Sequence, residues 1–260
     1  MRLPPFLRRL LLAVALLLPG LPVLAQSAPP SAALPPLGSF TTQQRQEIIA
    51  IIRDALRTDT SLLRDAITAL QEEEERAKSS VTTGVITDLQ QALVRNPGDP
   101  VAGNPNGDVT VVEFYDIRCP YCRRMVPVVN ELIRRDPNVR VVFKDFPILG
   151  PASTLGARAM LAAHKQGGYV KIYQALMTGS PALDEAGLRA AVGRAGLDWE
   201  RLQRDMGDPD IQGRINANLA LGRQLNIQGT PAYVIGNQML PGAVDLAALT
   251  AAVASARRAR

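Results

Sequence analysis

The two cysteines of this 260-residue sequence, Cys119 and Cys122, are separated only by Pro120 and Tyr121. A disulfide between them closes so small a loop that it would restrain little of the unfolded chain. Reactivity therefore explains the pair better than structural cross-linking does. In thiol–disulfide exchange one thiolate attacks a disulfide and a second thiol nearby resolves the mixed disulfide, which is chemistry suited to this spacing.

The residues around Cys119 predict an environment that stabilises its thiolate. Residues 109–115 are mostly β-branched or aromatic and predict a strand, and Pro120 is typical of the first position of a helix. Cys119 would then lie where free N–H groups and the positive end of the helix dipole favour an anion. Three arginines add positive potential: Arg118, Arg123 and Arg124. We expect Cys119 to attack, and the more deeply buried Cys122 to resolve.

Metal binding is the main competing interpretation of a Cys-x-x-Cys motif. A structural zinc ion takes about four ligands, and this sequence has no third cysteine and only one histidine, His164. We therefore predict no zinc site and a structural role for His164. Cu(I) binding by Cys119 and Cys122 stays open, because two thiolates suit this soft ion.

The first residues resemble a secretory signal peptide. Residues 1–25 combine three arginines, a short apolar run and a small-residue cleavage site ending at Ala25. Removing them lowers the net charge from +5 to +2, which gives no argument for nucleic-acid binding. The signal peptide predicts an exported, periplasmic protein. A flexible leader is expected over residues 26–40.

A helical module is expected over residues 41–95, with a broad apolar stripe that must be buried somewhere. The stripe could pack on the rest of the chain or on other copies of it, and we favour self-association as a homo-oligomer. A third helix of this module would carry Val85, Ile86, Leu89 and Leu93.

Residues 96–260 predict an α/β domain. A Pro- and Gly-rich linker over residues 96–108 precedes the first strand, and a helix then leads to a second strand at Val139–Phe143, as in a right-handed βαβ unit. Residues from about 150 to 221 are helical in pattern. A hairpin over residues 232–240 and a helix capped by Asp245 complete the domain.

Two motifs of this domain resemble those of DsbA-like proteins. They are residues 111–116 followed by Cys119-Pro120-Tyr121-Cys122, and Gly229-Thr230-Pro231-Ala232-Tyr233, which is similar to the family's cis-proline loop. The helical block at 150–221 matches the family's insertion, and residues 100–105, residues 142–150 and the N-terminal helices resemble the ScsC-type branch. The resemblance implies a thioredoxin fold with a helical insertion, preceded by a helical N-terminal module.

The resemblance also implies a substrate-binding edge. Thr230–Pro231 would be a cis peptide bond beside the cysteines, and the backbone of Thr230 would pair with an extended substrate peptide. Pro120 and Tyr121 would contact the same peptide.

A buried acid is implied beneath the cysteine pair. Glu113 would have a raised pKa and help to move the proton of Cys122, whereas the alternative is a carboxylate exposed at a sheet edge. Lys144 is expected to be the partner of Glu113 in a proton relay.

The sequence departs from DsbA between the cysteines, where Tyr121 replaces a histidine. A neutral tyrosine stabilises a thiolate less, so we expect a weaker oxidant than DsbA. Together with the helical module, this departure favours an isomerase or reductase that acts on misfolded exported proteins. We expect a membrane thiol–disulfide protein to be its redox partner. No cofactor is expected besides its own redox-active disulfide. The alternatives are a monomeric dithiol oxidase, a Cu(I)-binding copper-tolerance protein and a chaperone.

Overall fold

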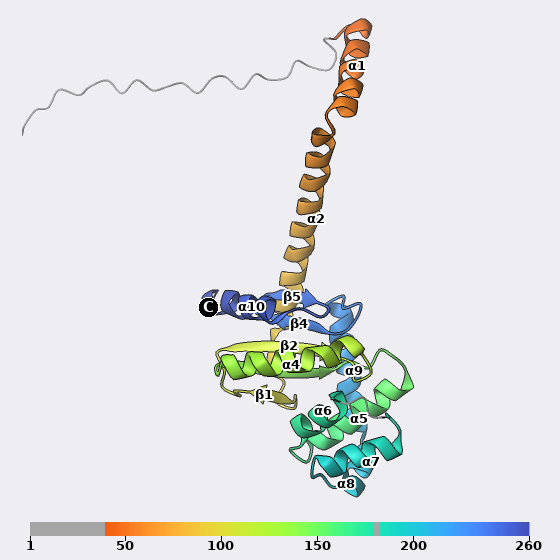
Figure 1. The fold of residues 1–260 in the computed structure, drawn as a ribbon, viewed down its shortest axis with the longest axis vertical. Helices are drawn as coiled ribbons and strands as arrows, with labels where there is room; N and C mark the ends of the chain where they lie inside the picture. Colours follow the sequence, from red (N-terminus) through yellow and green to blue (C-terminus); the bar gives the residue numbers. More distant parts are fainter. Residues whose placement is uncertain (1–39, 179–181, 260) are drawn as a thin grey trace, which may run out of the picture. The chain divides into compact units, whose positions relative to one another are not determined.

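The computed structural model describes residues 40–178 and 182–259 (Figure 1). The chain divides into two compact units, residues 1–63 and 64–260. The predicted signal peptide and all but the last residue of the predicted leader lie outside the described residues. No helix in the described part is both long and apolar enough to cross a membrane.

The first unit contains helix α1 (Thr42–Thr58), whose start is fixed by a capping box. The Thr41 hydroxyl accepts a hydrogen bond from the Gln44 N–H at 3.2 Å, and the Gln44 side-chain carbonyl accepts one from the Thr41 N–H at 2.9 Å. None of the residues of α1 is buried. Its exposed large apolar side chains are Ile48, Ile49, Ile51, Ile52 and Leu56.

Helix α2 (Thr60–Asp88) is separated from α1 by Asp59 alone. It continues to Asp88, so the separate third helix expected around Val85–Leu93 does not form. The short helix α3 (Gln90–Val94) follows instead. Ile86 of α2 and Leu93 of α3 are fully buried against Val112 and Phe114, because this end of the helical segment covers one face of the sheet.

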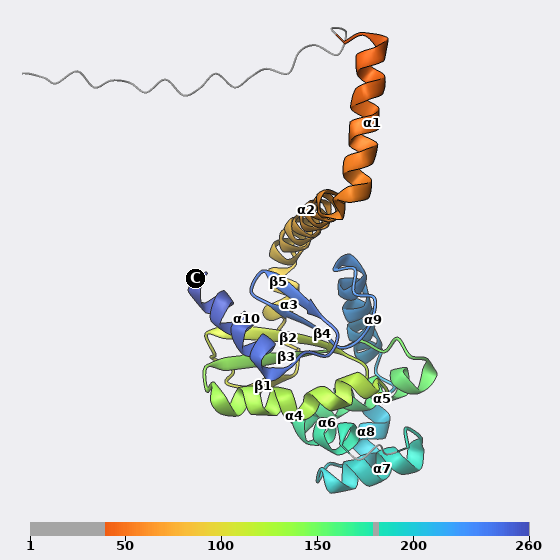
Figure 2. The same ribbon diagram turned by 45° about the horizontal axis from the view of Figure 1, so that its top comes forward.

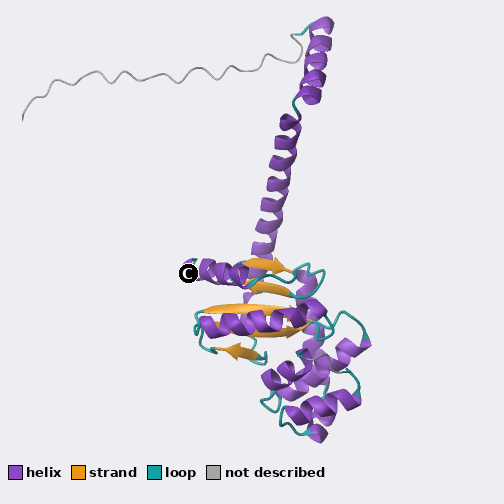
Figure 3. Cartoon of the chain, viewed as in Figure 1, coloured by secondary structure: helices purple, strands orange, loops and turns teal. Residues whose placement is uncertain are grey.

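The second unit is built on a β-sheet, whose strands are orange in Figure 3. The sheet has five strands in the order β1-β3-β2-β4-β5. The strands are β1 (Val101–Gly103), β2 (Val109–Tyr115), β3 (Val139–Asp145), β4 (Ala232–Ile235) and β5 (Gln238–Pro241). β2 and β3 are parallel, with Glu113 opposite Phe143, and the other neighbours are antiparallel. The predicted strands are confirmed; β1, inside the predicted linker, was missed because three residues show no periodicity.

Two helices cover the face of the sheet that carries Glu113 (Figure 2). Helix α4 (Pro120–Arg135) is the crossover between β2 and β3, and Met125, Val129 and Leu132 of its apolar side are buried. Helix α10 (Leu246–Arg258) starts at Asp245, whose carboxylate accepts from the Ala248 N–H at 2.8 Å, as predicted.

The helical insertion follows β3. It consists of α5 (Pro151–His164), α6 (Tyr169–Met177), α7 (Glu185–Arg194), α8 (Trp199–Asp205) and α9 (Pro209–Gln224). The predicted helical block is thereby confirmed over its described residues. Buried tyrosines of α6 pack in the same core as α4, so the insertion contributes to the interior beside the cysteines.

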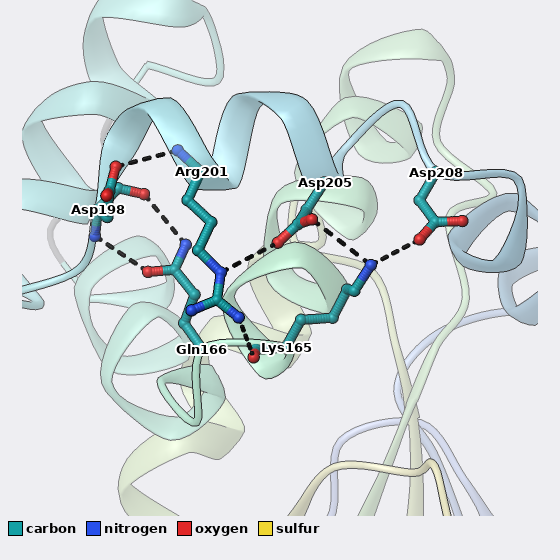
Figure 4. A network of polar contacts seen from close by, with 6 residues as sticks. All are labelled: Lys165, Gln166, Asp198, Arg201, Asp205 and Asp208. Atoms are coloured by element: carbon teal, nitrogen blue, oxygen red, sulfur yellow. Dashed lines mark hydrogen bonds and ion pairs between the residues drawn. The ribbon is translucent and has the colours of Figure 1, made fainter.

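A polar network joins three helices of the insertion (Figure 4). Lys165, after α5, reaches Asp208 at 2.6 Å and Asp205 at 3.5 Å. Gln166 exchanges two hydrogen bonds of 3.0 Å with the backbone of Asp198, the residue that caps α8. Exposed ion pairs add little stability individually, so the network chiefly fixes how the helix ends meet.

Candidate active site

Cys119 is the residue that caps α4, directly after the loop that leaves β2. Its side chain is almost covered, with 4% exposed, and its sulfur lies 3.2 Å from the carbonyl oxygen of Thr230, to which the thiol donates. Pro120 occupies the first turn, as predicted. The strand–helix junction expected from the sequence is therefore present, with Cys119 at its edge.

Cys122 lies one turn further into α4 and is completely buried. Burial raises the pKa of its thiol well above the ordinary value, and nearby Glu113 acts in the same direction. Both cysteines are free thiols in this structure. Of the pair, only Cys119 has any surface that an incoming disulfide could approach.

Glu113 is fully buried on β2, as the resemblance implied, and not exposed at a sheet edge. The Tyr233 hydroxyl donates a hydrogen bond to Glu113 Oε1 at 3.1 Å. Glu113 Oε2 has no hydrogen-bond partner among the described residues. Burial raises the pKa of this carboxyl to about 7, although the bond from Tyr233 lowers it. A carboxyl with this pKa exchanges its proton at neutral pH.

The expected cis peptide bond is present between Thr230 and Pro231. Pro231 is buried, whereas Tyr121 exposes 53% of its surface and lies beneath the Arg124 guanidinium, 4.3 Å from the ring centroid. The structure thus brings the predicted peptide-binding residues together around Cys119. Thr230 and Pro231 lie beside its sulfur, and Pro120 and Tyr121 follow it in the chain.

The predicted relay through Lys144 is wrong, because Lys144 lies on the opposite face of the sheet. Its strand neighbour Phe143 pairs with Glu113, so alternation directs Lys144 away from the cysteines. The Lys144 ammonium forms an ion pair with Asp99 and donates to the Ala92 carbonyl at 2.8 Å. Burial lowers the pKa of Lys144 and raises that of Asp99, and each charge opposes the shift of the other.

Asp116 is a site residue whose role the sequence interpretation missed. Its buried carboxylate accepts hydrogen bonds from the N–H groups of Arg118, Ile148 and Leu149, at 2.8, 2.8 and 2.9 Å. These bonds tie the loop after β3 to the loop that carries Cys119. An aspartate two residues before an arginine at a strand end was the available signal, since such side chains bond backbone N–H groups nearby.

A buried carboxyl on β3 was also missed. Asp145 accepts hydrogen bonds from Tyr115 at 2.8 Å and from Tyr169 at 2.9 Å, and the two hydroxyl oxygens are 2.8 Å apart. Burial raises the pKa of Asp145 to about 7. No sequence signal links Tyr169 to this strand, because the contact is made by the helical insertion.

The described residues contain no group of three or more His, Cys, Asp or Glu arranged to hold a metal ion. His164 ends α5 and packs edge-on against Tyr169, with the ring centroids 6.0 Å apart. Its pKa is lowered, mainly by burial. These contacts agree with the structural role predicted for His164.

A thioredoxin-type sheet with two thiols at the start of the crossover helix defines a thiol–disulfide oxidoreductase fold. Residues 110–254 match the model of the DSBA-like thioredoxin domain, so the chain belongs to this family of thiol–disulfide oxidoreductases.

Solved structures give the same result. A thioredoxin-like oxidoreductase from Silicibacter pomeroyi is 45% identical, with 65% of this chain and 98% of that one covered and a TM-score of 0.64. Proteus mirabilis ScsC in a transitional conformation is 29% identical over 86% of this chain and 99% of that one, with a TM-score of 0.63. A periplasmic thioredoxin-like protein from Salmonella enterica serovar Typhimurium is 28% identical over 65% and 96%, with a TM-score of 0.59.

The chain also matches curated Na(+)/H(+) antiporters of the NhaA type. It is 32% identical over 160 residues to one from Salinispora tropica. In three of these antiporters the match covers only 24% to 28% of the antiporter's length. It covers 61% to 70% of the present chain.

Proposed function

We propose that the chain exchanges disulfides with exported proteins, and that it acts as a disulfide isomerase or reductase. The observation that carries the proposal is the unequal burial of the two thiols. Cys119 retains a small exposed surface at the start of α4, and Cys122 is sealed directly behind it. One sulfur is therefore placed to meet a client, and the other to act only within the chain.

The proposed reaction begins when the Cys119 thiolate attacks a client disulfide. A mixed disulfide forms and one client thiolate leaves. Either that thiolate returns to a different client sulfur, which rearranges the pairing, or Cys122 resolves the complex. In the second case the Glu113 carboxylate accepts the Cys122 proton, the new thiolate attacks Cys119, and the second client thiolate leaves. The client disulfide is then reduced and the Cys119–Cys122 pair is oxidised.

The client peptide is proposed to lie along the edge formed by Thr230. Strand addition requires an accessible backbone, and Thr230 is only partly buried beside the sulfur of Cys119. Tyr121 would supply an apolar contact from α4, since half of its surface is free. The proposed clients are unfolded or misfolded proteins, because an extended segment must be available for pairing.

The proposal includes self-association through residues 41–95. An isolated helix gains little stability without burying an apolar side, yet α1 buries none of its residues in the single chain. Several active sites around one client would favour rearrangement over simple oxidation. Export to the periplasm is proposed from the residue pattern of the first 25 positions.

Light scattering of the full mature chain tests the oligomer. Ile51→Glu should lower the mass to that of one chain, because it places a charge on a side chain that exposes 67% in the monomer and would be covered in an assembly. Gln46→Glu, an exposed polar position of the same helix, is the matched control. A wild-type chain that runs as a monomer contradicts this part of the proposal.

The direction of exchange is tested with ribonuclease prepared in two forms. The reduced protein should reactivate scrambled, disulfide-bonded ribonuclease faster than the oxidised protein reactivates reduced ribonuclease. Cys119→Ser should abolish both activities, whereas Cys122→Ser should trap a mixed disulfide. A faster result with reduced ribonuclease would support an oxidase instead. Reactivation by Cys119→Ser would contradict thiol chemistry altogether.

A further inference from the structure

Two buried oxygen atoms near the cysteines lack hydrogen-bond partners among the described residues. They are Glu113 Oε2 and the hydroxyl of Tyr173 on α6. Their chemistry is complementary, because a carboxylate oxygen only accepts and a tyrosine hydroxyl can donate. Tyr173 packs against Tyr115 and Phe143, which flank Glu113 on the same face of the sheet. A buried polar group without a partner is unfavourable, so two such groups on this face call for a functional explanation.

Tyr173 lies within electrostatic reach of the groups that carry the chemistry. Burial raises the pKa of its hydroxyl well above the ordinary value, and the charges of Glu113, Cys122 and Asp145 add to this effect in that order. Those three groups approach Tyr173 from β2, α4 and β3. Glu113 itself is approached by Cys122 from α4, by Tyr173 from α6 and by Tyr233 from β4.

The ring of Tyr173 is held in place, although its hydroxyl forms no hydrogen bond with any residue that the structure describes. It packs edge-on against Tyr115, with the centroids 5.3 Å apart, and tilted against Phe143 at 4.8 Å. Tyr169 stacks on it at 6.5 Å. Tyr115 and Tyr169 are in turn bonded to Asp145. The hydroxyl is thus positioned by aromatic packing, before any charge forms nearby.

We propose that Tyr173 is a positioning residue for disulfide exchange, and that its hydroxyl donates to Glu113 Oε2 whenever that carboxyl is ionised. The inference rests on the proposed function, in which Glu113 accepts the proton of Cys122. Tyr173 keeps its own proton throughout. When Glu113 is protonated, as its pKa of about 7 allows at neutral pH, Oε2 is an uncharged and weaker acceptor. The helical insertion would then supply one part of the active site.

Tyr173→Phe tests the proposal, because it removes the hydroxyl and keeps the ring. Loss of a donor to the ionised carboxylate should raise the pKa of Glu113 by about one unit. The rate at which Cys122 resolves a mixed disulfide with a cysteine-containing peptide should then have its pH midpoint about one unit higher. The rate should fall about fivefold at pH 7 and return to the wild-type value near pH 9. A direct readout is the ¹³C NMR titration of the Glu113 carboxyl.

Tyr169→Phe is the matched control, since it removes a hydroxyl from the same helix that is bonded to Asp145. It should lower thermal stability and leave the midpoint of Glu113 unchanged, whereas Tyr173→Phe should keep its thermal stability at pH 5, where Glu113 is neutral in both proteins. Equal midpoints in Tyr173→Phe and the wild type, or an equal shift in both variants, would overturn the proposal. A uniform loss of rate at every pH would do so too. If the wild type exchanges no disulfides, the proposed function fails, and the NMR titration still decides whether Tyr173 donates to Glu113.

Discussion

The two faces of the central sheet each bury a charged side chain, and the two are compensated in opposite ways. On one face Lys144 is paired with Asp99 and also donates to the Ala92 carbonyl. On the other face Glu113 receives one hydrogen bond, from Tyr233, and its second oxygen has no partner in the described part of the chain. Both side chains come from the middle pair of parallel strands.

The difference separates a structural charge from a reactive one. A buried ion pair holds both partners in their charged forms, because losing a proton from one leaves the other uncompensated. A buried carboxyl with a single neutral donor is held much less firmly in its charged form, and burial moves its pKa towards neutrality. Of the two faces, only the Glu113 face carries a buried acid whose charge can change near neutral pH without leaving a counter-charge unpaired.

The largest expected effect comes from breaking the pair on the Lys144 face. Lys144→Met leaves the Asp99 carboxylate buried without its counter-charge, and should lower the free energy of unfolding by about 3–5 kcal/mol. Chemical denaturation at pH 7 measures this loss. The rate of disulfide exchange per folded molecule should stay at the wild-type value, because Lys144 points away from the cysteines.

Glu113→Gln is the matched control on the other face. It removes a charge that has no counter-ion, so its free energy of unfolding at pH 7 should equal or exceed that of the wild type. Its resolution step should slow by about 100-fold, the middle of the range for losing a general base. Similar losses of stability in both variants would contradict the contrast between the two faces. Adding Asp99→Leu to Lys144→Met should recover much of the lost stability.

A second effect is expected in the dependence of stability on pH. The pKa of Glu113 rises from 4.5 to about 7 on folding, so the folded chain binds more protons between these values than the unfolded chain does. Stability from this group is complete below pH 4.5 and is lost as the pH rises to 7, by roughly 3 kcal/mol. Asp145 should act in the same direction, since its pKa rises from 3.8 to about 7.

Denaturation curves between pH 4.5 and pH 8 test this sign. The wild type should lose stability as the pH rises, and Glu113→Gln should have a shallower slope by the contribution of one carboxyl. Asp145→Asn should reduce the slope by a similar amount, which makes it an independent check on the other buried acid. A wild-type stability that increases over this range would show that the carboxyls are paired in the folded state.

The sequence was sufficient for the parts of the fold that depend on local chemistry. The cap at Asp245, the strand before Cys119 and the helix starting at Pro120 follow from residue preferences alone. The burial of Glu113 was reached only through the resemblance. Family motifs therefore supplied what periodicity could not decide.

Two errors at the site share a physical cause, since each depended on register or on a distant contact. The predicted pairing of Lys144 with Glu113 fails although the two lie on adjacent strands, because a shift of one residue in register reverses the face of the sheet. The bond from Tyr169 to Asp145 spans 24 residues and depends on how the insertion packs. No pattern within either segment contains this information.

The smallest expected effect distinguishes the two buried carboxyls from each other. Tyr233→Phe removes the hydrogen bond that the Tyr233 hydroxyl donates to Glu113 Oε1, and since that bond lowers the pKa of Glu113, the pKa should rise further above 7. Above pH 8 the variant should lose about 1 kcal/mol of stability, and less at pH 5, where the carboxyl is neutral in both proteins. Tyr115→Phe is the matched control, because its hydroxyl donates to Asp145 instead. ¹³C NMR titration should show the Glu113 carboxyl shifted in the first variant alone; a shift in both would mean that the two carboxyls titrate as one unit.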